Sequence, residues 1–312
     1  MQRCGVFRCF FVPVHARYYV YNYMEKAKKI LFLTQEIEPY VSATTQSSIS
    51  RALIPAVQET GREVRTFTPK WGHINERRNQ LHEVIRLSGM NLIIDDTDHP
   101  LIIKVASLPS ARMQIYFIDN DDYFMKRGIL TDKDGKEYTD NCERAIFYAR
   151  GVLETVKKLR WTPDVIYCSG WMSALVPLYV KKLYFDTPFF ENTKVVLALD
   201  DAEYKVPFSS KFAEKTLVDS MLQGDVRSIS GLPVGYEDLM RLAIDNSDAV
   251  VLASENVNSR LLNYAENRGK QVLPYVEESY EVKKETKETK GQIQQDAKLM
   301  EFCKSLLPSE QE

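Results

Sequence analysis

The sequence predicts an α/β protein built on a doubly wound, mostly parallel sheet with a β-hairpin insertion. The main observation is that short apolar, β-branched runs alternate with amphipathic stretches along the chain. The runs are apolar at successive positions, as in strands buried between two layers of helices: "KILFLT", "EVRTFTP", "NLIIDD", "LIIKVAS", "MQIYFID", "DVIYC", "KVVLAL" and "AVVLAS". The composition agrees, because 44% of the 312 residues are hydrophobic and 27% are charged, as in an ordinary globular protein.

The first strand is expected at residues 29–34, and a helix follows it. Pro55 is expected to kink this helix and Gly61 to close it in a left-handed cap, and its apolar positions recur at helical spacing: Ile49, Ala52, Leu53, Ala56 and Val57. The turn between them, "EIEPYVSATTQSSIS", directs free backbone N–H groups and the positive end of the helix dipole at a ligand, typically a phosphate. Such turns are usually rich in glycine, and this one contains none.

Two more helices and an insertion complete the pattern. "DNCERAIFYARGVLETVKKL", residues 140–159, has Asp140 as its expected N-cap, with a glutamate three positions later as in a capping box. "WMSALVPLYVKKLYF", residues 171–185, follows the strand "DVIYC". Residues 91–107 and 111–119 are expected to form antiparallel hairpins, which gives a parallel sheet with a β-rich insertion.

The charge balance and the scattered metal-binding residue types exclude several classes of function. There are 41 Lys and Arg against 43 Asp and Glu, so no net field favours nucleic acid or an anionic membrane, and we expect neither as a partner. No run approaches the roughly 20 apolar residues of a membrane span. The four histidines and five cysteines show no metal-ligand spacing and no CxxC pair, so we expect no metal and a reduced, cytoplasmic protein.

Three segments are expected along the chain. Residues 1–23 are basic, with Met24 as an alternative start, and we expect a disordered leader or an artefact of start-codon choice. Residues 24–270 form the folded domain. Residues 271–312 are expected to be a charged, solvated tail that ends in an amphipathic helix with one apolar face: Ile293, Ala297, Met300 and Cys303.

Four stretches, in order, resemble motifs of the bacterial glycogen and starch synthases. "KILFLTQEIEPY" is similar to their opening strand, which continues through Lys-Thr-Gly-Gly-Leu, and "YTDNCERAIFYARGVLE" to their Tyr-x-Asp-Asn-x-x-Arg-Phe helix start. "WTPDVIYCSGWMSALVPLYVK" matches their Pro-Asp-x-x-His-x-x-Asp-Trp-His-x-x-Leu-x-Pro-x-Tyr segment, and "KVVLALDDAEY" falls where they have a strand ending in His-Asn. The resemblance covers roughly residues 28–265.

The resemblance implies one half of a GT-B fold, the Rossmann-like domain on the acceptor side. It implies transfer of glucose from ADP-glucose to an α-1,4-glucan or maltooligosaccharide in glycogen biosynthesis, with no cofactor. A GT-B enzyme closes a second domain over the donor, and that domain supplies most of the nucleotide pocket. After residue 251 only about sixty residues remain, so we expect a separate donor-domain chain.

The resemblance also suggests site residues, and each has a plainer explanation. Asp140 matches the family's catalytic aspartate near the transferred sugar, with Asn141 beside it, although helix capping alone would explain an aspartate there. The other expected substrate-binding residues are Glu36, Ser42, Thr44, Thr45, Trp171, Asp200, Asp201 and Tyr204. The turn residues Ser42, Thr44 and Thr45 can equally cap the helix, Trp171 can equally be a core residue, and the Asp200–Asp201 pair can cap the next turn.

Departures from the family pattern leave three functions open. The turn lysine is absent, and losing one charged contact to a leaving group can cost on the order of 3 kcal/mol of transition-state stabilisation. Ser169, Gly170 and Met172 stand where the family prefers His, Asp and His. The chain is therefore interpreted as a synthase-like glucosyltransferase domain with little activity alone, as a non-catalytic glucan-binding or regulatory module, or as a Rossmann-like domain used for protein contacts.

Overall fold

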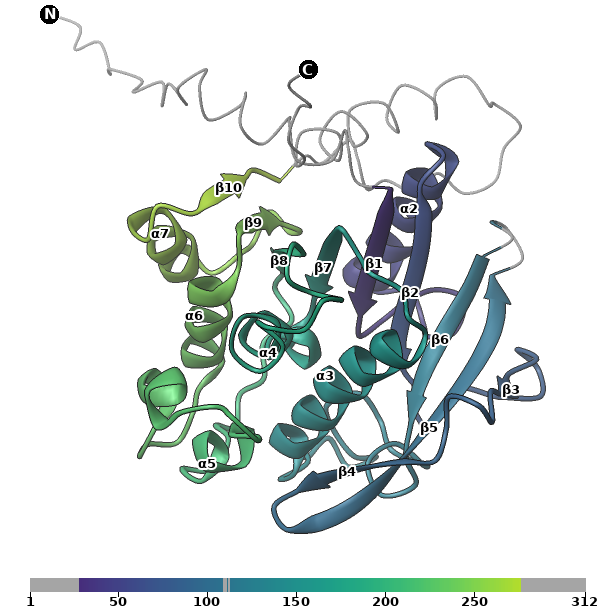
Figure 1. The fold of residues 1–312 in the computed structure, drawn as a ribbon, viewed down its shortest axis with the longest axis horizontal. Helices are drawn as coiled ribbons and strands as arrows, with labels where there is room; N and C mark the ends of the chain where they lie inside the picture. The colour runs from purple at the N-terminus through teal and green to yellow at the C-terminus, as the bar shows by residue number, and fades with distance from the viewer. Residues whose placement is uncertain (1–27, 109–110, 112, 276–312) are drawn as a thin grey trace, which may run out of the picture.

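A single mixed sheet organises the chain. The computed structural model describes residues 28–275 except 109–110 and 112. Within them, ten strands form a sheet in the order β10-β9-β8-β7-β1-β2-β6-β5-β3, with β4 paired to β5 (Figure 1). The strands are β1 (Lys29–Thr34), β2 (Glu63–Pro69), β3 (His82–Glu83), β4 (Met90–Ile94), β5 (Thr97–Leu108), β6 (Met113–Asp119), β7 (Val165–Ser169), β8 (Lys194–Leu199), β9 (Ala249–Leu252) and β10 (Gln271–Leu273).

The strand directions give the sheet a topological switch point. All pairs from β10 across to β6 are parallel, whereas β5 pairs antiparallel with β6, β3 and β4. The expected parallel sheet and antiparallel insertion are confirmed. From β1 the chain first adds β2 and β6 on one side and then returns to place β7 on the other. The carboxyl ends of β1 and β7 therefore flank a switch point, where open α/β sheets bind ligands.

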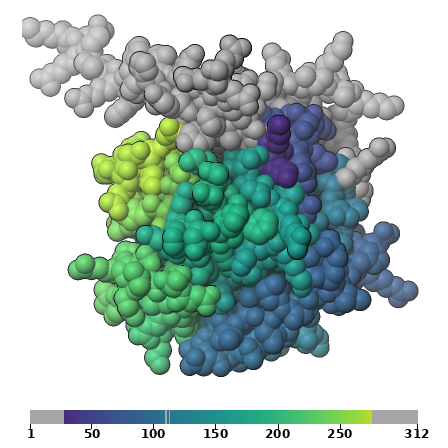
Figure 2. Space-filling view, viewed as in Figure 1, coloured from purple at the N-terminus to yellow at the C-terminus, as the bar shows by residue number. Residues whose placement is uncertain are grey.

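Helices cover both faces. They are α2 (Thr45–Glu59), α3 (Asn141–Lys158), η1 (Trp171–Ser173), α4 (Val176–Lys182), α5 (Phe212–Thr216), η2 (Gln223–Ile229), α6 (Tyr236–Asn246) and α7 (Ser259–Asn267). Figure 1 shows α3, α4 and α6 in front of the sheet. The helix α2 connects β1 to β2 on one side of β1, whereas α3 leads from β6 to β7 on the other side. Because such crossovers are right-handed, α2 and α3 lie on opposite faces of the sheet. In Figure 2 the teal residues of α3 and α4 fill the centre of this side, with the blue β-insertion below them.

The helix α2 begins at Thr45 and continues through Pro55, and Gly61 after it has φ +85°, as the predicted left-handed cap requires. Two other predicted segments differ from the structure in their boundaries. The expected helix at 171–185 is instead a short turn followed by α4, because Pro177 lies in the first turn of α4, where its missing N–H costs nothing. The strand β10 lies in the range expected for the tail and pairs with β9.

The two terminal predictions fall outside the described part of the chain. The leader at residues 1–23 and the amphipathic helix near Cys303 lie among residues that the structure does not describe. Among residues 28–275, leaving aside the three omitted positions, no helix is long and apolar enough to cross a membrane.

Candidate functional site

The predicted site residues come from loops at one edge of the sheet. Glu36 follows β1, Asp140 lies in the connection after β6, and Asp200 and Asp201 follow β8. These parallel strands all end at the same edge, so loops far apart in sequence meet there. The edge includes the switch point between β1 and β7, and we call it the carboxyl edge.

The turn between β1 and α2 is closed by its own side chains. Thr44 is the N-cap of α2, and its hydroxyl accepts from the Ser47 N–H at 3.0 Å while the Ser47 hydroxyl accepts from the Thr44 N–H at 2.8 Å. The Thr44 hydroxyl also donates to the Glu36 carboxylate at 2.6 Å, and Glu36 is buried. Ser42, Thr44 and Thr45 are exposed. The positive end of α2 therefore faces a carboxylate of the chain itself, and the capping interpretation holds for Thr44.

A glutamine that the sequence-based site did not include bridges the switch point. The Gln46 side chain, at the start of α2, donates from Nε2 to Ser169 Oγ at 2.9 Å and to Asp200 Oδ2 at 3.0 Å. Gly170 has φ +84°, and a Cβ there would lie 2.6 Å from Gln35 Oε1 and 2.7 Å from Gln46 Nε2. With φ +84° and ψ 157°, this backbone conformation is essentially restricted to glycine, and the missing Cβ lets the ends of both glutamine side chains approach it.

Asp200 is a buried acid that has no cationic partner among the described residues. It is 4% exposed, and its Oδ1 accepts from the Ala202 N–H at 3.1 Å. Burial raises the pKa of Asp200 to about 7, and the nearby carboxylates of Asp201 and Glu36 push in the same direction. Asp201 is exposed and accepts from the Ser254 hydroxyl at 3.1 Å. The pair predicted from the sequence is therefore split into a buried acid and an exposed one.

Asp140 is the N-cap residue of α3, as expected, but its side chain does not close the cap. The Asp140 carbonyl accepts from the Arg144 N–H at 3.0 Å, whereas the carboxylate makes no capping hydrogen bond. Instead both carboxylate oxygens accept from Arg127, whose Nη1 lies 2.7 Å from Asp140 Oδ2 and whose guanidinium stacks 4.2 Å from the centre of the Tyr138 ring. The bidentate pair holds the carboxylate in one orientation because both of its oxygens are engaged.

Asn141 is part of the scaffold. It is 2% exposed, its Nδ2 donates to the Leu130 carbonyl at 3.0 Å, and its Oδ1 accepts from Arg144 at 2.7 Å. Arg144 is fully buried and donates also to the carbonyls of Tyr123, Ile129 and Gly128. These contacts tie the loop after β6 to α3.

The two aromatic residues of the predicted site are packed into an aromatic cluster. Trp171 is 1% exposed and lies edge-on to Tyr204 and Phe208, with ring centres 5.9 and 6.1 Å away. Tyr204 is 4% exposed, stacks on Phe208 at 4.2 Å and donates its hydroxyl to the Val234 carbonyl at 3.2 Å. Of the two interpretations left open for Trp171, the structure supports the core one.

The sequence-based site also missed the turn after β2. Lys70, Trp71 and His73 follow Pro69, the last residue of that strand, and lie at the same edge. Trp71 Nε1 donates to the Gln35 carbonyl at 2.6 Å, which joins this turn to the end of β1. The sequence could have indicated this turn, because every loop that follows a parallel strand reaches the same edge of the sheet and β2 is one of these strands. Among the described residues, no group of three or more His, Cys, Asp or Glu side chains could hold a metal ion.

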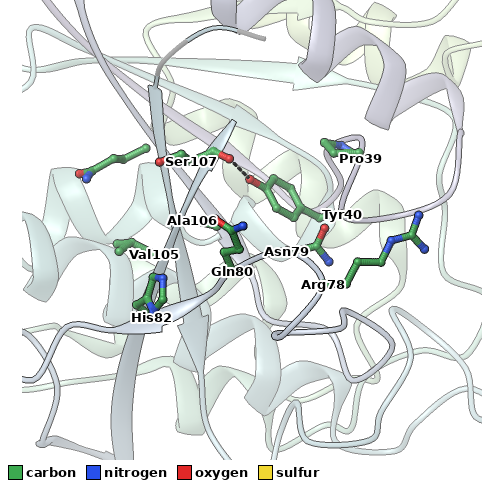
Figure 3. Close-up of a pocket in the computed structure, with 10 residues that line it drawn as sticks. Pro39, Tyr40, Arg78, Asn79, Gln80, His82, Val105, Ala106 and Ser107 are labelled. Carbon is green, nitrogen blue, oxygen red and sulfur yellow. Dashed lines mark hydrogen bonds between the residues drawn. The ribbon is translucent and has the colours of Figure 1, made fainter. Parts of the chain in front are cut away.

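A cavity of about 400 Å³ lies next to the same β1–α2 connection but contains none of the predicted residues. Its walls include Tyr40, whose hydroxyl donates to the Ser107 carbonyl at 3.1 Å, and burial raises the pKa of Tyr40 to about 12. Figure 3 shows Arg78 on one side of Tyr40 and His82 on the other.

Comparison with known proteins gives consistent results. The family model "Starch synthase catalytic domain" matches residues 29–273. A glycogen synthase of Chlorobium luteolum is 33% identical over 228 residues, which are 73% of this chain and 46% of that protein. A glycogen synthase of Chlorobaculum tepidum is 34% identical over 236 residues, 75% of this chain and 47% of that protein. The chain thus spans about half the length of the curated relatives it matches.

A solved structure has the same fold. The catalytic domain of starch synthase IV from Arabidopsis thaliana, bound to ADP and acarbose, superposes with a TM-score of 0.63 at 16% identity, over 80% of this chain and 51% of that one. This likeness confirms the expected half of a GT-B fold. With the match of the family model over most of the described residues, it follows that the chain belongs to the glycogen and starch synthase family, within its catalytic domain.

Proposed function

We propose that this chain is the acceptor-side half of an ADP-glucose-dependent α-1,4-glucan synthase. The observation that carries the proposal is the carboxyl edge: in a fold of the synthase family, one edge of the sheet gathers Glu36, Asp140 and Asp200 around the switch point. Catalysis then requires a donor-side half, either on a continuation of this chain or on another polypeptide. The substrates are ADP-glucose and a glucan with a free non-reducing end.

The polar groups of this edge suit sugar hydroxyls better than phosphate oxygens. Glu36 and Asp200 present carboxyl oxygens, which accept hydrogen bonds, near the N-terminus of α2. Phosphate oxygens need donors or cations there, and like charges repel them. In the proposed complex Asp140, fixed by Arg127, faces the transferred sugar, whereas the diphosphate is held mainly by the donor-side half.

The 312-residue chain alone is expected to be inactive. The leaving diphosphate receives no lysine from the β1–α2 turn, and the other half of the cleft is needed to exclude water and orient the donor. The test measures ADP release and maltooligosaccharide extension from ADP-glucose. The chain is assayed alone and together with the second half of the Chlorobaculum tepidum relative, and that second half is assayed alone as the control.

We expect glucan extension only when the two halves are combined, and loss of most of it in an Asp140→Asn chain. Arg127 can still donate to the one carbonyl oxygen of asparagine, so the fold should tolerate this change. Extension that is equal with the Asp140→Asn chain would contradict the assigned role of Asp140. No extension with any donor-side half would contradict the proposed catalysis itself.

A second candidate function is a non-catalytic α-glucan-binding or regulatory module of glycogen metabolism. It is favoured by the closed switch point, where the Gln46 side chain occupies the space between Ser169 and Asp200. This module would bind maltooligosaccharides without turnover in every combination of halves. Calorimetric titration of the chain with maltooligosaccharides, compared with the extension assay, separates the two functions.

A further inference from the structure

The turn after β2, residues 70–74, is a rigid element of the carboxyl edge. The Lys70 N–H donates to the Ile118 carbonyl at 2.8 Å, and the Ile74 N–H donates to the Trp71 carbonyl at 2.9 Å. The Trp71 ring is fully buried, under the guanidinium of Arg144 at 5.1 Å from the ring centre. Both ends of the turn are therefore anchored in the core.

The turn is also fixed on its two flanks. On one side Trp71 Nε1 donates to the Gln35 carbonyl at 2.6 Å, next to Glu36. On the other side the Gly72 N–H donates to the Arg127 carbonyl at 2.8 Å, and a Cβ at Gly72 would lie 2.2 Å from the backbone nitrogen of Arg127. The turn is thus wedged between the end of β1 and the loop whose arginine holds Asp140.

His73 is the exposed side chain of this turn. Lys70, Trp71 and Ile74 are buried, and Gly72 has no side chain. Lys70 is 7% exposed and its ammonium lies 2.8 Å from the Glu76 carboxylate, so its charge is engaged. The anchored backbone therefore holds the Cα of His73 in place at the edge, so less conformational entropy is lost when its exposed side chain meets a ligand than on a mobile loop.

We propose that His73 contacts the bound sugar, as a hydrogen-bonding partner for a hydroxyl of a neutral α-glucan at the carboxyl edge. This inference rests on the proposed function for the kind of ligand and goes beyond it in assigning the residue. A neutral imidazole has one donor and one acceptor nitrogen, which matches the dual character of a sugar hydroxyl.

The surroundings of His73 favour a neutral ligand over an anionic one. Although the His73 side chain is exposed, the protein around it partly shields the ring from water, and this desolvation lowers the pKa of His73. The Glu36 carboxylate opposes this effect, and the Lys70 ammonium adds to it. The net direction favours the uncharged ring at neutral pH. With the Lys70 ammonium paired to Glu76 and the Glu36 carboxyl group nearby, the edge offers little attraction to phosphate.

The test uses histidine imidazole signals of the full chain in nuclear magnetic resonance. The sequence has only four histidines, so the signals can be assigned with single variants. His82, exposed and on the short strand β3, is the matched control. The chain, labelled on histidine, is titrated with maltotriose and, separately, with inorganic pyrophosphate.

We expect maltotriose to shift the His73 signal and leave that of His82 in place, and pyrophosphate to shift neither. The loss of one hydrogen bond predicts that His73→Ala weakens maltotriose binding about two- to tenfold. His73→Gln, which keeps a donor and an acceptor, should restore much of the affinity, and His82→Ala should not change it. Circular dichroism confirms that each variant is folded.

Several results would overturn the assignment. They are maltotriose binding that leaves the His73 signal unmoved, a larger shift with pyrophosphate than with maltotriose, and no maltotriose binding at all. A His73 shift together with absent glucan extension would leave this assignment intact and contradict only the proposed catalysis. The two proposals can therefore fail separately.

Discussion

Replacing Asp200 by asparagine should make the chain more stable at alkaline pH relative to the wild type. The native carboxyl is 4% exposed, and within the part of the chain that the structure describes its direct partners are hydrogen-bond donors and not cations: Gln46 Nε2 and the Ala202 N–H. Asparagine has the same shape without the charge. Because Gln46 Oε1 has no partner among the described residues, the Gln46 amide can flip and accept from the new side-chain amide.

The magnitude follows from the difference in pKa between the folded and unfolded chain. In the folded chain the pKa of Asp200 is raised to about 7, against about 3.9 for an unfolded aspartate. The folded state thus binds the proton more tightly, so its contribution to stability is fully present below about pH 4 and is lost as the pH rises to about 7. At about 1.4 kcal/mol per pH unit, the loss between pH 5 and pH 8 is on the order of 3 kcal/mol.

The assay is urea denaturation at several pH values, followed by circular dichroism. Wild type, Asp200→Asn and the control Asp201→Asn are compared, because Asp201 is the exposed neighbour on the same loop. The free energy of unfolding of Asp200→Asn should rise relative to wild type across this range, while Asp201→Asn should keep most of the wild-type pH dependence, because burial, the main cause of the raised Asp200 pKa, is unchanged. Parallel curves for wild type and Asp200→Asn would refute the argument that Asp200 is a buried acid with a raised pKa.

Two further predictions concern the scaffold around the site. Gly170→Ala should lower the free energy of unfolding by about 1–3 kcal/mol, because φ +84° with ψ 157° is strained for any residue with a Cβ and the new Cβ displaces the ends of the Gln35 and Gln46 side chains. Gly61→Ala, a helix-cap position where a new Cβ meets no atom of the described residues within 4 Å, should cost less in the same urea assay, and equal losses would contradict this argument. Arg127→Gln should lower the free energy of unfolding by about 1 kcal/mol in urea denaturation, because its ion pair with Asp140 is partly exposed. The double variant Arg127→Gln with Asp140→Asn should lose little more free energy than the single one. Losses that add up would argue against the ion pair.

The sequence by itself was enough for the fold class and for part of the site. Strand and helix periodicity are local properties, so the parallel core, the antiparallel insertion around β5 and the cap at Gly61 could be predicted. The motifs placed Glu36, Asp140 and Asp200 at loops that do meet at one edge. The order of strands explains this, since loops after parallel strands share an edge whatever their side chains contact.

Only the tertiary structure decided what those side chains do. Gln46 bonds to Ser169 and Asp200, which are 123 and 154 residues away along the chain. The Asp140 carboxylate binds Arg127 and makes no capping bond, although Asp140 is the N-cap residue of α3, and Trp171 packs against Tyr204 in the core. These contacts depend on which loops the folded sheet brings together, and no local pattern records that. The end of β2 indicates in the sequence that the turn with His73 lies at this edge, but only the folded chain shows that Trp71 of this turn bonds to Gln35 and that His73 is exposed.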